Sequence, residues 1–173
     1  MKVVAKVKPI KANISPYGQW HFANDYLYTA DLYRKNPPHK GYSPVPYESY
    51  CIALELGLKA FLRAREMPVT EIEKVGHNFT KLLATAKDLD LEKYALLTEP
   101  QKKLIIQAGE LFRGGKKIQR NNGHKNLSYS YVDIAHIAFN LGAKGALPLP
   151  DLGELHSVTE YLIQNLREIC LKS

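Results

Sequence analysis

Residues 46–66, PYESYCIALELGLKAFLRARE, decide the fold class of this chain. The stretch opens with a proline, which the first turn of a helix tolerates, and no further proline interrupts it. At 100° per residue, most of the circumference is apolar, and the polar side chains fall on one stripe about 80° wide. The stripe consists of Glu48, Glu55, Lys59, Arg63 and Glu66. We therefore predict a buried central helix with a single polar seam that faces water or a partner.

Apolar residues at helical spacing predict further helices on both sides of this one. A first helix over residues 19–35 ends at Asn36-Pro37-Pro38, because proline lacks the backbone donor that a helix needs. Further helices are predicted from cap signatures and periodicity: a short one near residues 70–73, then 77–89, 98–112 and from residue 151 onwards. Residues 133–141 fit either a helix or a strand.

Period-two alternation in residues 127–131 and 2–8 favours a short β pair between these segments. The expected fold is an all-α antiparallel bundle of five or six helices around the buried central helix, with strands in a minor role. A chain of 173 residues fits a single domain, which we place over residues 1–173.

Several functional classes find no support in the composition. No apolar run approaches the roughly 20 residues that span a bilayer, and lysines interrupt the N-terminus before a signal region could form, so we expect a cytoplasmic protein. Cys51 and Cys170 lie in apolar, helix-like stretches and are predicted to be buried free thiols. The six histidines lack zinc-type spacing, and no phosphate loop, dinucleotide fingerprint or nucleophile elbow is present. We therefore expect no cofactor and no metal.

The net charge of +7 is concentrated in two segments. A basic N-terminal arm, residues 1–16, carries four lysines, and no acid occurs before Asp25. A basic loop, residues 114–131, belongs to an acid-free stretch over residues 112–132 with five cationic residues. Such local patches attract anionic partners. The alternative, a solvated loop beside a basic tail, stays open at this point.

The chemistry of the basic loop suits RNA. Guanidinium and ammonium groups bind phosphate, and tyrosine rings such as Tyr129 and Tyr131 stack on bases. The predicted nucleotide- or RNA-binding residues are Arg113, Lys116, Lys117, Arg120, Lys125 and Tyr129. Arg120 and His124 are the catalytic candidates, because metal-free RNA cleavage needs a cation at the phosphate and a group that moves a proton.

Two segments of the chain resemble a known family. Residues 50–62, YCIALELGLKAFL, and residues 76–83, GHNFTKLL, are similar to the HEPN domain (higher eukaryotes and prokaryotes nucleotide-binding). Its members pair a helix of the form Ala-x-Glu-x-x-x-Lys-Ala-x-Leu with a Gly-His-Asp-Leu-x-x-Leu segment. Glu55, Lys59 and His77 fall on these motif positions and are assigned a motif or structural role, whereas Asn78 and Phe79 replace the acid and the leucine.

The resemblance implies an antiparallel helical bundle, often a homodimer, with RNA or nucleotide as ligand. Many family members are metal-independent ribonucleases of toxin–antitoxin or phage-defence systems. Others are inactive binding modules, or partners of small nucleotidyltransferases. The active members carry Arg and His with about four to six residues between them. Here three residues separate Arg120 from His124, which makes the chain a divergent member whose enzymatic activity stays open.

Three hypotheses follow. The favoured one is a HEPN-like nucleotide- or RNA-binding module with a degenerate catalytic motif, of a defence or toxin–antitoxin type system. The second is a metal-independent endoribonuclease toxin that uses Arg120 and His124. The third is a protein-interaction adaptor without a nucleic-acid role. Expected partners are RNA or nucleotide, an antitoxin or nucleotidyltransferase, and a second copy of the chain, with no membrane.

Overall fold

The helix expected at residues 46–66 is the central element of the structure, a computed structural model. This helix, α2, spans Pro44–Ala64 and begins slightly earlier than predicted, because Ser43 caps it by accepting a hydrogen bond from the Val45 N–H. It packs against α1, α7 and α4, and most of its apolar side chains are fully buried. The prediction of a buried central helix is confirmed.

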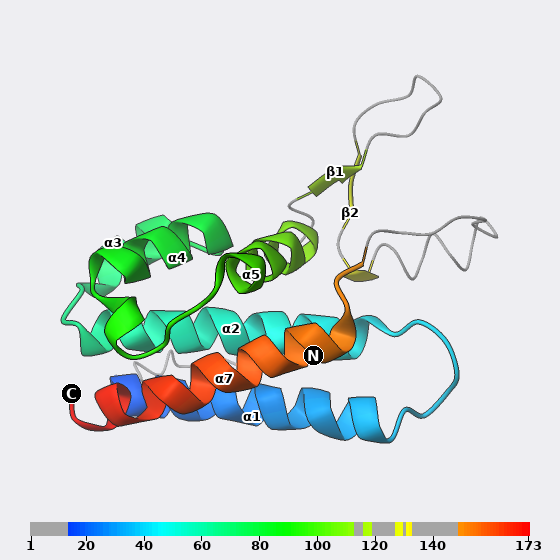
Figure 1. Cartoon of the computed structure of the whole chain (residues 1–173), viewed down its shortest axis with the longest axis horizontal. Helices are drawn as coiled ribbons and strands as arrows, with labels where there is room; N and C mark the ends of the chain where they lie inside the picture. Colours follow the sequence, from blue (N-terminus) through cyan, green and yellow to red (C-terminus); the bar gives the residue numbers. More distant parts are fainter. Residues whose placement is uncertain (1–13, 113–115, 119–126, 130, 133–148) are drawn as a thin grey trace, which may run out of the picture.

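The structure describes residues 14–112, 116–118, 127–129, 131–132 and 149–173. Within these ranges the fold is an all-α bundle, as the periodicity predicts, with one pair of short strands at its edge (Figure 1). The basic arm, including residues 2–8, and the ambiguous segment 133–141 lie outside the described residues.

Two long helices cover one side of α2. These are α1, Pro16–Lys35, and α7, Leu152–Leu171; α1 runs antiparallel to both α2 and α7 (Figure 1). Ser15 caps α1 and Asp151 caps α7, each by accepting a backbone N–H bond. The Trp20 indole donates a 2.7 Å hydrogen bond to the Ile163 carbonyl, which satisfies its polar atom while burying its ring.

Shorter helices cover the other side of α2 (Figure 1). They are α3 Val69–Val75, α4 Phe79–Asp88, the 3₁₀ turn η1 Leu91–Lys93 and α5 Glu99–Leu111. The capping box predicted at residues 98–101 is present, with Thr98 and Gln101 bonding to each other's backbone N–H groups. Asn78 caps α4, so His77 precedes the helix instead of opening it.

The basic loop contains two strands. β1, Lys116–Ile118, pairs antiparallel with β2, Leu127–Tyr129, so that Lys116 lies opposite Tyr129 and Ile118 opposite Leu127. Of the segment 127–131 predicted to be a strand, residues 127–129 form one, and Tyr131 lies beyond its end. Its partner among the described residues is β1, which is too short to show a period of two. The partner that we expected, residues 2–8, lies outside the described residues.

Part of the polar seam of α2, which was predicted to face water or a partner, is covered by other segments of the same chain. Glu55 is only 6% exposed, because the segment before α4 covers it. Arg63 donates to the carbonyl of Ile14, at the N-terminal side of α1. Both cysteines are buried and unpaired, as expected. No helix among the described residues is long and apolar enough to cross a membrane.

Candidate nucleic-acid-binding site

The hairpin formed by β1 and β2 stands off the end of α5, at one end of the bundle (Figure 1). Three of the predicted binding residues, Lys116, Lys117 and Tyr129, lie on its strands. The register places Lys116 opposite Tyr129, so a cationic and an aromatic residue occupy one pair position. The hairpin therefore joins the two residue types that contact phosphates and bases.

The other predicted loop residues lie outside the described part of the chain. These are the binding candidates Arg113, Arg120 and Lys125, and the catalytic candidate His124. The catalytic pairing of Arg120 with His124 therefore stays a prediction from the sequence.

Tyr131 anchors the second strand of the hairpin to the bundle. Its side chain is fully buried, and its hydroxyl donates a 3.2 Å hydrogen bond to the Ala108 carbonyl of α5. Tyr42 donates a 2.8 Å bond to the Tyr131 carbonyl, and the Tyr47 ring stacks on the Tyr131 ring with centroids 4.9 Å apart. The suggestion that Tyr131 stacks on bases is wrong, because a fully buried ring is not accessible to a ligand.

Burial also fixes the protonation of these tyrosines. Desolvation raises the pKa of both Tyr42 and Tyr131, because it disfavours the charged phenolate. The neutral hydroxyls remain hydrogen-bond donors across the physiological range. The anchor of the hairpin is therefore insensitive to pH near neutrality.

Glu55, Lys59 and His77, the residues on the family motif, form one cluster. The Glu55 Oε1 atom lies 2.7 Å from Lys59 Nζ and 2.7 Å from His77 Nδ1. Glu55 Oε2 is buried and has no hydrogen-bond partner among the described residues. Because Glu55 is on α2 and His77 precedes α4, the contact ties the central helix to the layer above it. This geometry supports the structural role.

His77 also faces a cavity beside the root of the hairpin. The cavity, of about 380 Å³, lies between the start of α4 and the end of α5, and Thr80, Glu110 and Phe112 contribute to its walls. Phe112 ends α5 just before β1. The Glu55 cluster therefore reaches the surface next to the basic segment.

A second polar cluster was not foreseen from the sequence. Tyr50 on α2 donates a 2.7 Å bond to Asp31 on α1, and His156 Nε2 on α7 lies 3.2 Å from the same carboxylate. Desolvation is the larger cause that raises the pKa of Tyr50, and the hydrogen bond to Asp31 raises it further. These positions are far apart in the chain, so no motif spacing reveals them. The described residues contain no group of three or more His, Cys, Asp or Glu arranged to hold a metal ion.

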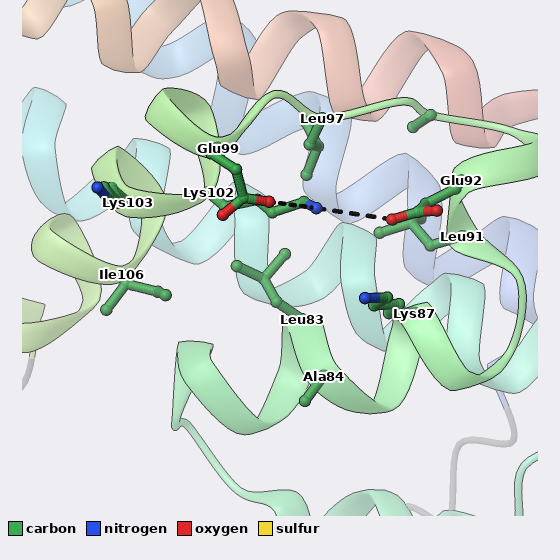
Figure 2. A pocket seen from close by; sticks show the side chains of 11 residues that line it. Leu83, Ala84, Lys87, Leu91, Glu92, Leu97, Glu99, Lys102, Lys103 and Ile106 are labelled. Carbon is green, nitrogen blue, oxygen red and sulfur yellow. Dashed lines mark hydrogen bonds and ion pairs between the residues drawn. The ribbon is translucent and has the colours of Figure 1, made fainter.

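A pocket of about 270 Å³ lies between α4, η1 and α5 (Figure 2). Leu83 and Leu97 give it apolar walls. Figure 2 shows Lys102 between two carboxylates, with Nζ 2.9 Å from Glu99 and 3.6 Å from Glu92. With Lys87 and Lys103, the lining holds three lysines against two glutamates, so its net charge of +1 is well below the +5 of residues 112–132.

The motifs that resemble the HEPN domain lie in residues 50–62 and 76–83. The Glu55–His77 contact brings these two segments together in space. A scan against protein-family models, a search of curated proteins and a search of solved structures each find no match to this chain.

Proposed function

We propose that this chain is a HEPN-like RNA-binding module, of a defence or toxin–antitoxin type system, in which the β1–β2 hairpin contacts the phosphate backbone. The observation that carries the proposal is the strand pair inside the most basic, acid-free stretch of the chain. Under the alternative, in which this segment is only a solvated loop, no backbone pairing between two strands would be required. Two-stranded ribbons are among the elements that proteins use to engage nucleic acids.

The charge distribution supports the same surface. Residues 112–132 carry +5 and residues 1–24 carry +4 of a total of +7, so the remainder of the chain is slightly acidic. A phosphate backbone is attracted to the hairpin side, and binding there releases condensed counterions. Strand pairing holds part of the basic segment in place before binding, which reduces the entropy lost on association.

The HEPN-like part of the proposal is supported by the packing. The two segments that resemble the family are separated in sequence, yet they meet through Glu55 and His77. If the two segments resembled the HEPN motifs only by chance, nothing would require their motif residues Glu55 and His77 to be in contact. The bundle is then the scaffold, and the hairpin is the binding element that extends from it.

The test is RNA binding by fluorescence anisotropy with a labelled single-stranded oligonucleotide. Replacing Arg113, Lys117 and Arg120 by alanine should weaken binding about tenfold or more, because three phosphate contacts are lost. The matched control replaces Lys74, Lys93 and Lys172, whose side chains on the bundle are 71%, 70% and 73% exposed. It removes the same charge and should leave binding within about twofold of wild type.

Two outcomes of this experiment contradict the proposal: wild-type affinity in the hairpin variant, or an equal loss in the control. The same reactions separate a binding module from a ribonuclease. A module leaves the RNA intact on a sequencing gel. Cleavage that His124→Ala abolishes would instead assign the chain to the ribonuclease class.

A further inference from the structure

A tyrosine-rich pocket lies where the α1–α2 loop meets the start of α7. Its volume is about 240 Å³. The residues that give it its chemistry are Tyr33, Arg34, His39, Tyr42 and Tyr47. The loop and the hairpin lie at the same end of the bundle (Figure 1). We name this the tyrosine pocket.

The lining of the tyrosine pocket combines flat rings with positive charge. Three of its residues are tyrosines, Arg34 is cationic, and His39 is an exposed imidazole with polar ring nitrogens. No carboxylate is among the described residues that line it. The Arg34 Nε atom is buried and has no hydrogen-bond partner among the described residues, whereas the Arg34 side chain also bonds to the Tyr50 hydroxyl. A ligand with both an aromatic ring and an anionic group suits this lining.

The tyrosine hydroxyls of the pocket carry no negative charge. Desolvation raises the pKa of Tyr42 and of Tyr47, and the nearby Asp151 carboxylate adds to the effect on Tyr47. Both hydroxyls therefore stay neutral donors at physiological pH. The Tyr33 hydroxyl accepts a 3.0 Å bond from Ser43, which fixes the loop wall against α1. The lining is therefore held in place and carries no negative charge of its own, and the nearest acids acting on it are Glu48 and Asp151, which are not among the lining residues.

The tyrosine pocket is connected to the hairpin through Tyr131. Tyr47 stacks on Tyr131, which follows β2 by two residues, and Tyr42 hydrogen-bonds the Tyr131 carbonyl. Two residues that line the pocket thus hold the root of the hairpin. The pocket and the root of the hairpin are therefore neighbours in the fold.

We infer that the tyrosine pocket binds one unpaired nucleotide of the RNA held by the hairpin. The base lies among the tyrosine rings and a phosphate lies against Arg34 and His39. This inference rests on the proposed function, because the hairpin delivers the strand. Ligand pockets for drug-sized molecules are typically about 300–1,000 Å³, so the smaller volume here suits a single nucleotide better than a longer segment.

Selectivity for single strands follows. A base in a duplex is stacked and paired and cannot enter a pocket, whereas an unpaired base can leave the stack. Aromatic stacking is tolerant of sequence, since every base has a π face. The protein should therefore prefer single-stranded to duplex RNA, with little preference among bases.

The first arm of the test compares a single-stranded RNA with a blunt duplex of the same length by anisotropy. Tyr33→Leu, which removes a ring from the pocket, should weaken single-strand binding about tenfold and leave duplex binding unchanged. The matched control is Tyr28→Leu, also on α1 but 63% exposed and outside the pocket. It should bind both RNAs like wild type. His39→Ala changes an exposed side chain, so it tests the pocket even if Tyr33→Leu folds poorly.

The second arm locates the base directly. A 4-thiouridine oligonucleotide is photocrosslinked to the intact wild-type protein, and the modified peptides are identified by mass spectrometry. Crosslinks within residues 33–47 are expected. Crosslinks confined to residues 113–129, together with equal affinity for single strand and duplex, overturn the inference and leave the proposed function standing. Wild-type protein that binds no RNA, or binds it independently of the hairpin charges, overturns both.

Discussion

Glu55 shows how one side chain connects sequence pattern to packing. Its carboxylate is 8% exposed and accepts bonds from both Lys59 and His77 through Oε1. Burying a carboxylate is costly unless cations and hydrogen bonds compensate its charge. The helical spacing predicts the Lys59 partner. It does not predict His77, whose approach depends on the turn that brings the start of α4 back over α2.

Removal of the Glu55 carboxylate should destabilise the fold. Glu55→Ala leaves Lys59, only 15% exposed, without its acidic partner. We expect the free energy of unfolding to fall by about 2–4 kcal/mol, measured by urea denaturation. The control is Glu71→Ala, which breaks the Lys74 pair at the same 2.7 Å distance on the surface. That change should cost less than about 1 kcal/mol, and equal losses in the two variants would argue against a structural role for Glu55.

The two cysteines should be unreactive in the native state. Burial raises the pKa of Cys51, and it raises the pKa of Cys170 to about 12. The thiol, not the reactive thiolate, therefore predominates at pH 8. A thiol-titrating reagent should react only on the timescale of unfolding in native buffer, and should titrate both thiols at once in guanidinium. Rapid labelling of either cysteine without denaturant would show that the core opens locally.

At the scale of elements, local signals predicted most of the bundle. Periodicity placed α2, and capping residues such as Thr98 and Asp151 placed the starts of α5 and α7 within one or two residues. The pairing of β1 with β2 was not foreseen, because three-residue strands carry almost no periodic signal. The sequence also did not predict that other segments cover the polar seam of α2. Helical spacing shows which residues of a helix are polar, but it does not show which element packs on them.

The contact between α4 and α5 depends on Gly109. A Cβ atom at this position would lie 2.3 Å from Phe79 Cδ2 and 2.9 Å from Phe79 Cβ, so the whole ring would have to move. At Gly57 the only conflict shorter than 3.0 Å is with the terminal Cδ1 of Ile163, which can rotate more easily. The close approach of α4 to α5 therefore requires a glycine at position 109.

Gly109→Ala should accordingly lower the melting temperature. Overpacking costs about 1–3 kcal/mol, and alanine's better helix propensity returns only about 1 kcal/mol of that. Gly57→Ala is the matched helical comparison and should be clearly less destabilising. Both are measured by thermal denaturation followed by circular dichroism. A Gly109→Ala protein as stable as wild type would mean that α4 and α5 are packed more loosely than described.

At the scale of the whole molecule, the features linked to binding gather at one end of the bundle. The hairpin and the α1–α2 loop lie at that end (Figure 1). Tyr47, which lines the tyrosine pocket, stacks on the Tyr131 anchor of the hairpin. The sequence predicted the basic segment, because the charge of a segment is counted directly from its residues and needs no structure. It did not predict the pocket, because Tyr33, Tyr47 and Leu152 come from three helices whose assembly no local pattern encodes.

The central claim, that the hairpin contacts phosphates, is tested most directly by the salt dependence of RNA binding. For single strands the slope of log K against log salt is about −0.7 per phosphate contact. We therefore expect a slope shallower than that of wild type by about 2 in the triple variant Arg113→Ala, Lys117→Ala, Arg120→Ala. The control, in which Lys74, Lys93 and Lys172 are replaced, should keep the wild-type slope. An unchanged slope in the hairpin variant would contradict the account.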